Sequence, residues 1–360
     1  MNNTDVIIIE PFYGGSHKVL IDSITHSFQN ENIKYSLVTL PSKKWHWRAR
    51  CGALQLYEKI PKITNQKTLF ASSVLNISEL IGMRPDLSPL RKIIYFHENQ
   101  LIYPVQEIKS RDVQYAYNQI TTCLAADIVL FNSEFNMSSF LNNIHRILKC
   151  LPDHRPKSIK DKIALKSTVL YFPISFPMQS IKEKSMSVLH IVWPHRWEFD
   201  KGPNDFFEVL FKLKLEHIPF QVSVLGEMYS EVPKIFEKAK QELSDNIVQF
   251  GYVDSKESYY DVLSSAHVAV STAKHEFFGV SMLEATYWGC FPLVPNSLVY
   301  PEIYPQQCLY KNNEELYKQL QKLCLNPSLS VKLRQDCDID VEKYSDTRLI
   351  PTYLEIIKGS

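Results

Sequence analysis

Short apolar runs recur along this chain, and a polar loop and then a helical pattern follow most of them. The first run, residues 6–9, is β-branched and uninterrupted, which is typical of a strand buried on both faces of a parallel sheet. A polar stretch at 177–187 separates the runs into two series. The earlier series comprises 6–9, 35–40, 68–71, 92–96, 127–131 and 169–172, and the later one 188–193, 221–225, 247–250, 268–270 and 291–294. This pattern predicts an α/β protein with two Rossmann-like, doubly wound domains that face each other across a cleft.

The length of 360 residues is sufficient for two such domains. We expect the first domain at 1–178 and the second at 187–340. A short amphipathic helix is expected within 341–360, with the first domain as its docking surface. The formal net charge is only +1, so a polyanion would have to bind a local basic patch rather than the whole surface.

The cysteines and the N-terminus exclude several classes of protein. Seven cysteines are scattered without a CxxC pair, which argues for reduced thiols and against a disulfide framework or a zinc site. The start of the chain lacks the basic and apolar regions of a signal peptide. No window reaches the roughly 18 apolar residues of a membrane span. We therefore expect a soluble protein inside the cell, with no membrane partner.

The stretch 268–285 carries the strongest candidate site. It reads as a short strand, a loop rich in hydrogen-bonding groups and the start of a helix near Gly279. Glu276 then lies in the loop before the helix, and Glu284 lies within the helix. Ligands of open α/β sheets bind at such loops, and a helix N-terminus there suits a phosphate. The alternative is a capped amphipathic helix with solvated glutamates.

The loop after run 188–193 offers two long cations, Arg196 and Lys201, which could clamp a diphosphate. Ordinary salt bridging is the alternative for both. Gly226 and Gly251 follow the next two runs and would let a flat base approach the backbone. The predicted pocket binds a nucleotide diphosphate, and its donor-binding residues are Gly14, Gly15, Arg196, Lys201, Gly226, Gly251, Glu276, Phe277, Phe278, Gly279 and Glu284.

In the first domain, a Gly14–Gly15 turn follows run 6–9, and His97 follows run 92–96. Both positions are at the ends of predicted strands, where they would face the cleft. The alternatives are a tight turn alone and a histidine that only bonds to backbone.

The segment 43–50 is basic and contains two tryptophans, a composition suited to phosphates and unpaired bases. The alternative is a solvated basic loop with one tryptophan in the core. The segment 153–166 is also basic and is either a surface loop or part of the same anion-binding face. The candidate nucleic-acid contacts are His17, Lys43, Lys44, Trp45, Trp47, Arg48, Arg50, Asn99 and Arg155.

These motifs resemble those of the retaining, GT-B-fold glycosyltransferases of family 4. Glu276 and Glu284 match the acid pair E-x7-E, and Arg196 and Lys201 match the cations of the second domain. Longer blocks resemble a branch of the family that mannosylates the queuosine nucleoside of transfer RNA. These blocks are 12–17, 43–50, 70–76, 95–104, 152–157, 192–198 and 271–280. The chain departs from the family at 172–176, which lacks Asn-Gly, and after Gly226, which no second glycine follows.

The resemblance implies a GDP-mannose donor on the second domain and, as acceptor on the first domain, tRNA-Asp carrying queuosine at position 34. The implied catalytic residues are His97, Glu276, Arg196 and Lys201, with Glu284 on the donor ribose. No cofactor and no metal are expected, and Asp336–Asp340 is interpreted as a solvated segment. The expected compartment is the cytoplasm, with the nucleus as a second. The sequence does not indicate an oligomeric state.

Three other interpretations stay open at this point. A family 4 enzyme could act on a glycan or lipid acceptor, and a relative that has lost catalysis could only bind RNA. A sugar-phosphate isomerase on a similar fold would need a further acid/base set. The intact Arg196, Lys201, Glu276 and Glu284 favour a transferase.

Overall fold

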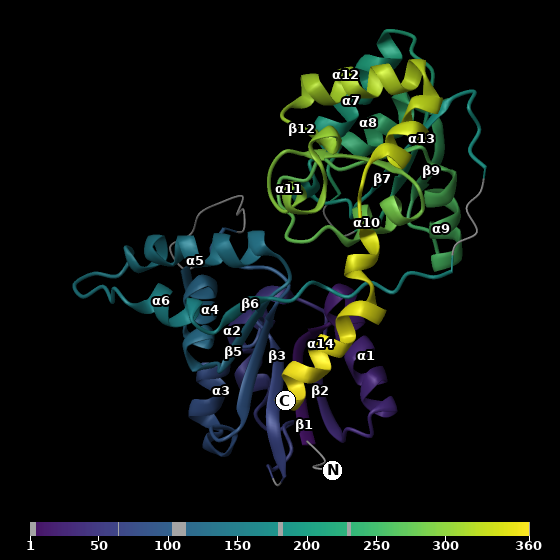
Figure 1. Cartoon of the computed structure of the whole chain (residues 1–360). Helices are drawn as coiled ribbons and strands as arrows, with labels where there is room; N and C mark the ends of the chain where they lie inside the picture. The colour runs from purple at the N-terminus through teal and green to yellow at the C-terminus, as the bar shows by residue number, and fades with distance from the viewer. Residues whose placement is uncertain (1–4, 64, 103–112, 179–182, 229–231, 360) are drawn as a thin grey trace. The chain divides into compact units, whose positions relative to one another are not determined.

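The computed structural model describes residues 5–63, 65–102, 113–178, 183–228 and 232–359. The chain divides into two compact units (Figure 1). The first contains Met1–Ser175 and Lys343–Ser360, and the second contains Phe176–Glu342. Part of the expected linker at 177–187, residues 179–182, is outside the described residues.

The first unit is built on a six-stranded parallel sheet with the order β2-β1-β3-β4-β5-β6. Its strands are β1 (Asp5–Tyr13), β2 (Tyr35–Pro41), β3 (Gln66–Ser72), β4 (Arg91–Phe96), β5 (Ile128–Phe131) and β6 (Ser167–Val169). Its helices are α1 (Gly15–Asn30), α2 (Trp45–Leu56), α3 (Ile77–Met83), α4 (Val113–Ala125), α5 (Glu134–Leu148), α6 (Ile159–Ala164) and α14 (Asp346–Lys358). The chain winds from β1 outward to β2 and then crosses to β3, so the topological switch point lies between β1 and β3.

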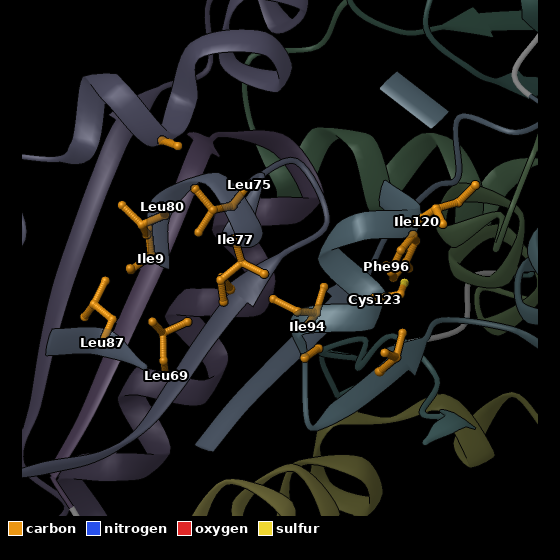
Figure 2. Packing of buried hydrophobic residues seen from close by; sticks show 14 of the residues in the cluster. Ile9, Leu69, Leu75, Ile77, Leu80, Leu87, Ile94, Phe96, Ile120 and Cys123 are labelled. Carbon is orange, nitrogen blue, oxygen red and sulfur yellow. The ribbon is translucent and has the colours of Figure 1, made fainter. Parts of the chain in front are cut away.

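Apolar side chains of the strands and helices form the core of this unit. Figure 2 shows part of it, with Ile9 of β1, Leu69 of β3 and Ile94 of β4 among the labelled residues. All three are fully buried. The strands are apolar on both faces because helices cover both sides of the sheet. This packing fixes the carboxyl ends of β1, β3 and β4, from which candidate site residues extend.

The C-terminal helix α14 belongs to the first unit. Thr68 Oγ1 of β3 donates a hydrogen bond to Ile357 O at 3.1 Å, and Tyr353 OH donates to Tyr171 O at 2.9 Å. A parallel bridge between Ile174 and Ser345 brings the returning chain onto this unit. The first unit is therefore completed by the end of the chain.

The second unit repeats the architecture with the sheet order β12-β11-β10-β7-β8-β9. Its strands are β7 (Leu189–Pro194), β8 (Phe220–Leu225), β9 (Ile247–Gly251), β10 (Val268–Val270), β11 (Phe291–Pro295) and β12 (Leu309–Tyr310). Its helices are α7 (Pro203–Leu215), α8 (Ile235–Glu242), α9 (Lys256–Ser265), α10 (Val280–Tyr287), α11 (Tyr300–Ile303), α12 (Asn313–Leu325) and α13 (Pro327–Asp336). The winding direction reverses between β7 and β10, which places the switch point at these two strands.

The two parallel sheets with flanking helices confirm the prediction of an α/β protein with two Rossmann-like, doubly wound domains. Two local interpretations were incomplete. Most of the segment 43–50 is not a loop, because α2 begins at Trp45, and the basic segment 153–166 contains the short helix α6. Across the described residues, no helix has both the length and the apolar character that a bilayer crossing requires.

Candidate active site

Two loops meet at the switch point of the second unit, one after β7 and one after β10. Lys201, from the short 3-10 helix Phe199–Lys201, is buried between them. Its Nζ donates to His275 O at 2.9 Å and to Glu276 Oε2 at 3.2 Å, and it lies 3.4 Å from Asp200 Oδ2. The structure thus brings Lys201 and Glu276 into direct contact.

This ion pair fixes the charge states of both partners. Burial favours the neutral acid, but Lys201, His195 and the backbone N–H of Phe278 outweigh burial and lower the pKa of Glu276 from 4.5 to about 2. Burial likewise lowers the pKa of Lys201, but Glu276 and Asp200 outweigh it and the net pKa is raised. Glu276 is therefore a carboxylate and Lys201 an ammonium at neutral pH.

The post-β10 loop is held in shape by hydrogen bonds to the post-β7 loop. Thr272 Oγ1 donates to Lys201 O at 3.0 Å and accepts from Trp193 Nε1 at 3.0 Å. Gly202 has φ +63°, and a Cβ there would lie 2.1 Å from Thr272 O, so only glycine permits this approach. The two loops form one rigid surface.

His195 lies between the charged groups of this surface. It is 4% exposed, and its Nε2 has no hydrogen-bond partner among the described residues. Burial, followed by the charge of Lys201 and opposed by that of Glu276, lowers the pKa of His195 to about 3, with a smaller lowering by Arg196. Arg196 is half exposed and pairs with Glu198 Oε2 at 3.1 Å. One electrostatic environment therefore surrounds four side chains, namely His195, Arg196, Lys201 and Glu276.

The two acids of the E-x7-E motif are placed as the sequence predicted. The helix α10 begins directly after Gly279, with Glu276 in the preceding loop and Glu284 inside the helix. Tyr259 OH donates to Glu284 Oε2 at 3.2 Å, and burial raises the pKa of Glu284. Phe277 and Phe278 are buried, and both of their backbone N–H groups donate to Glu276 Oε1, at 3.1 and 3.3 Å.

The two glycines expected to contact a base differ. Gly226 has φ +133°, and a Cβ there would lie 1.9 Å from His195 O, so the protein's own backbone requires this glycine. Gly251 has φ +110°, with open space where a Cβ would point. Only Gly251 leaves room on that side for a ligand.

In the first unit, a cluster of acids and histidines lies beside the switch point between β1 and β3. His97 follows β4, and His17 lies on α1, after the Gly14–Gly15 turn. The two imidazole rings stack with their centroids 3.9 Å apart. Glu10 of β1 contributes a fully buried carboxylate, with Oε2 located 3.2 Å from His17 Nδ1.

Sequence reasoning missed Glu10. The signal was an acid at the end of an otherwise apolar buried strand, where a charge requires a partner.

Glu10, His17 and His97 offer three ligand atoms that lie within 4.8 Å of one another. The lone pairs of the two imidazoles lie in their ring planes, and these planes are stacked with an angle of 29° between them. Stacked rings cannot both direct a lone pair at one ion about 2 Å from each nitrogen. The residues present therefore do not fit a metal ion in this arrangement.

The predicted RNA-binding residues are distributed unevenly. Lys43, Lys44 and Trp47 are exposed at the start of α2, with Trp47 52% exposed. Trp45 packs against Tyr115, with the ring centroids 5.2 Å apart. The exposed residues therefore form a basic, aromatic surface, which we call the α2 start.

Three further candidate RNA-binding residues make side-chain contacts inside the first unit. The Arg50 guanidinium lies 4.6 Å from the centroid of the Tyr115 ring, and Arg48 donates to Gln55 Oε1 at 2.6 Å. Asn99 is fully buried, and its amide donates to Asn136 and Ser139. Its side chain therefore organises the loop after β4 instead of reaching RNA.

Arg155 is exposed in the segment before α6. Its Nε donates to Leu151 O at 3.1 Å. Because the residue is exposed, it remains a candidate contact for an anion.

Among solved structures with this architecture is sucrose-phosphate synthase from Thermosynechococcus elongatus. The match covers 99% of this chain and 100% of the synthase chain, with a TM-score of 0.72 and 12% sequence identity. The lipopolysaccharide outer core galactosyltransferase WaaB covers 99% of both chains with a TM-score of 0.61 at 14% identity. These likenesses show the fold, which is that of the GT-B glycosyltransferases. Residues 179–341 also match the family model "Glycosyl transferases group 1". The chain is therefore a glycosyltransferase with a GT-B fold.

Residues 5–174 match a second family model, "tRNA-queuosine alpha-mannosyltransferase N-terminal". A tRNA-queuosine alpha-mannosyltransferase from Drosophila melanogaster is 45% identical over 98% of this chain and 96% of its own length. The chain belongs to the tRNA-queuosine alpha-mannosyltransferase family and is a hexosyltransferase.

Proposed function

We propose that the chain transfers a mannosyl group from GDP-mannose to queuosine at position 34 of tRNA-Asp, with retention of the α-configuration. The membership of its family supports mannose as the sugar and queuosine in tRNA as the acceptor. The observation that carries the donor site is the contact between Lys201 and Glu276 at the switch point of the second unit. Ligands of doubly wound folds bind at this position.

The charges of the second unit suit a departing diphosphate. As the bond to the sugar breaks, negative charge grows on the nucleotide, and preorganised cations lower the barrier to this step. Arg196 is exposed enough to reach the diphosphate by exchanging its surface pair with Glu198. Lys201 is buried and acts mainly through its field and by orienting Glu276, whose carboxylate would accept hydrogen bonds from sugar hydroxyls.

The acceptor side of the proposal uses the first unit. The α2 start offers two lysines for phosphates and Trp47 for stacking on an unpaired base. Anticodon loops present such bases. His97 would contact the transferred sugar. The reaction needs no cofactor or metal, since the cations of the protein neutralise the leaving group, and we place the enzyme in the cytoplasm, where mature tRNA is found.

The test is a transfer assay with purified protein and radiolabelled GDP-mannose. Its tRNA arms are tRNA-Asp with queuosine, tRNA-Asp with guanosine at position 34, and other tRNAs carrying queuosine. Its donor arms replace GDP-mannose with GDP-fucose or UDP-glucose. We expect label only with GDP-mannose and queuosine-bearing tRNA-Asp, and nucleoside mass spectrometry should show one added hexose on queuosine.

The other outcomes separate the rival functions. Label on a glycan or lipid extract but not on tRNA would mean that the acceptor is a glycan or a lipid. Binding of tRNA without transfer under any donor would indicate an inactive RNA-binding relative. Transfer from a different sugar nucleotide would refute the GDP-mannose assignment alone.

A further inference from the structure

The cluster in the first unit contains more ionisable groups than the proposed role of His97 requires. Glu10 comes from β1, His17 from α1, and His97 and Glu98 from the loop after β4. Glu10, His17 and His97 are each at most 7% exposed. Burying two histidines and an acid together is costly unless their charges are matched.

His17 lies between two carboxylates. Its Nδ1 is 3.2 Å from Glu10 Oε2, and its Nε2 is 3.7 Å from Glu98 Oε2. A neutral imidazole carries a proton on only one nitrogen, so a carboxylate near each nitrogen favours the doubly protonated imidazolium. Burial alone would lower the pKa of His17, but Glu10 and Glu98 outweigh it and raise the pKa to about 10.

The carboxylate of Glu10 is held on its other side. Its Oε1 accepts hydrogen bonds from Phe12 N at 2.8 Å and from Ser72 Oγ of β3 at 3.0 Å. These donors fix the acid between β1 and β3. The position of His17 is therefore determined by the sheet rather than by a flexible side chain.

His97 stacks on this imidazolium. The ring centroids are 3.9 Å apart. Tyr95 packs edge-on against His97, with the ring centroids 4.9 Å apart. A second positive charge so close to the His17 imidazolium is strongly disfavoured. Burial first, and the charge of His17 second, hold the pKa of His97 well below its usual value.

The remaining titratable groups around the stack do not alter this result. Tyr95 of β4 and Tyr353 of α14 lie next to each other, with ring centroids 5.8 Å apart. Burial raises the pKa of both tyrosines, so they are neutral at physiological pH. Glu98 is 21% exposed and already faces His17.

We propose that Glu10 and His17 are positioning residues for the transfer reaction. Their ion pair fixes the ring plane of His97 and, together with its burial, keeps His97 neutral, so that one nitrogen can make a defined hydrogen bond with a hydroxyl of the transferred sugar. His97 Nε2 has no hydrogen-bond partner among the described residues, which leaves it available for that contact. This inference rests on the proposed function for its activity readout, but not for its charge states.

The experiment compares three variants of the full-length protein. His17→Phe keeps a flat ring and removes the charge, and it leaves Glu10 without a counter-ion. The double variant Glu10→Gln/His17→Phe removes both charges. His26→Phe is the matched control, because His26 is an exposed histidine on the same helix.

Two readouts are measured between about pH 5.5 and 9, namely the NMR titration of histidine rings and the kcat and KM of transfer. In the native protein, we expect His17 to stay protonated and His97 to stay neutral over this range. In the double variant, the pKa of His97 should rise above its native value, although burial still holds it below the ordinary value of about 6.5. The kcat should gain an acidic limb at this raised pKa, with a roughly tenfold loss below it. The KM for the donor should change by less than about threefold, since the positioned hydrogen bond acts on the reacting state.

His17→Phe should be less active than the double variant, since the unpaired Glu10 would then favour a protonated His97. A double variant with the native pH profile would overturn the inference. Losses of kcat that follow thermal stability alone, without a new limb, would also overturn it. If the native protein transfers no mannose, the proposed function fails, whereas the NMR titration still decides the charges of His17 and His97.

Discussion

Lys201 Nζ and Glu276 Oε2 lie 3.2 Å apart, and this contact joins the loop after β7 to the loop after β10. The other carboxylate oxygen of Glu276 accepts the backbone N–H groups of Phe277 and Phe278. One ion pair therefore determines both the charge of the proposed donor site and the backbone path into α10. Function and local stability are coupled at these residues.

Replacing Lys201 with alanine should consequently affect both properties. We expect transfer to fall by about 10²–10³-fold, the scale of losing a preorganised charge in an active site. Removal of one partner from a buried pair should also destabilise the protein by about 3–5 kcal/mol. Single-turnover transfer and urea denaturation measure the two effects.

Lys274→Ala is the matched control, because Lys274 lies in the loop after β10 that carries Glu276 but pairs at the surface with Asp205, at 3.3 Å. The replacement of Lys274 should lower the free energy of unfolding by about 0–1 kcal/mol. Near-native turnover of the Lys201 variant would count against the donor site.

The depressed pKa of Glu276 predicts a pH dependence of stability. The folded protein holds this pKa at about 2, compared with the ordinary value of 4.5. The unfolded state then binds more protons, so the contribution of Glu276 is complete above pH 4.5 and is lost as the pH falls toward 2. Urea denaturation at a series of pH values should show this loss, and Glu276→Gln should show a shallower decline. Parallel curves for the two proteins would refute the assignment.

The strand and helix pattern allowed the second unit to be predicted well. The run 268–270 corresponds to β10, and Gly279 precedes α10 as expected. Parallel strands covered by helices leave a continuous apolar signature, and a glycine with positive φ marks the start of the helix. The placement of Glu276 in the loop and Glu284 in the helix followed from these two features alone.

Tertiary context decided the features that sequence reasoning missed. The sequence analysis did not predict helix α2, because the charged residues at its start drew the interpretation toward a loop. Its apolar residues Ala49, Ala53 and Leu56 nevertheless recur at helical spacing and are buried. The burial of Asn99 depends on Asn136, which lies 37 residues away on α5. Such contacts between distant segments leave no periodic signal in a single sequence.

Gly226 illustrates the same limit and gives a further prediction. The sequence suggested that a ligand requires this glycine, whereas His195 O already occupies the space of a Cβ. Gly226→Ala should therefore destabilise the second unit by more than about 2 kcal/mol, through overpacking and the positive φ together.

Gly251→Ala is the control, since its φ is also positive but the space is open. It should cost about 1–2 kcal/mol from backbone strain alone. Thermal denaturation of both variants, without any ligand, makes the comparison. An equal effect at the two positions would contradict the role of His195 O.

Replacement of Trp47 tests whether the α2 start binds the tRNA acceptor. At 52% exposure, this side chain contributes little to the core, so Trp47→Ala should leave the free energy of unfolding within about 0.5 kcal/mol of native. If Trp47 stacks on an unpaired base, its loss should weaken tRNA binding by about 1–3 kcal/mol, or roughly 5- to 150-fold. The affinity for GDP-mannose should not change.

The control is Leu54→Ala, because Leu54 is 63% exposed on the same helix and offers no aromatic face. It should leave both affinities unchanged, as measured by filter binding with tRNA and calorimetry with the sugar nucleotide. An equal loss of tRNA affinity in the two variants would mean that α2 acts through its fold, because a stacking contact depends on the ring at position 47 alone. A loss of donor affinity with Trp47→Ala would instead assign the α2 start to the sugar-nucleotide site.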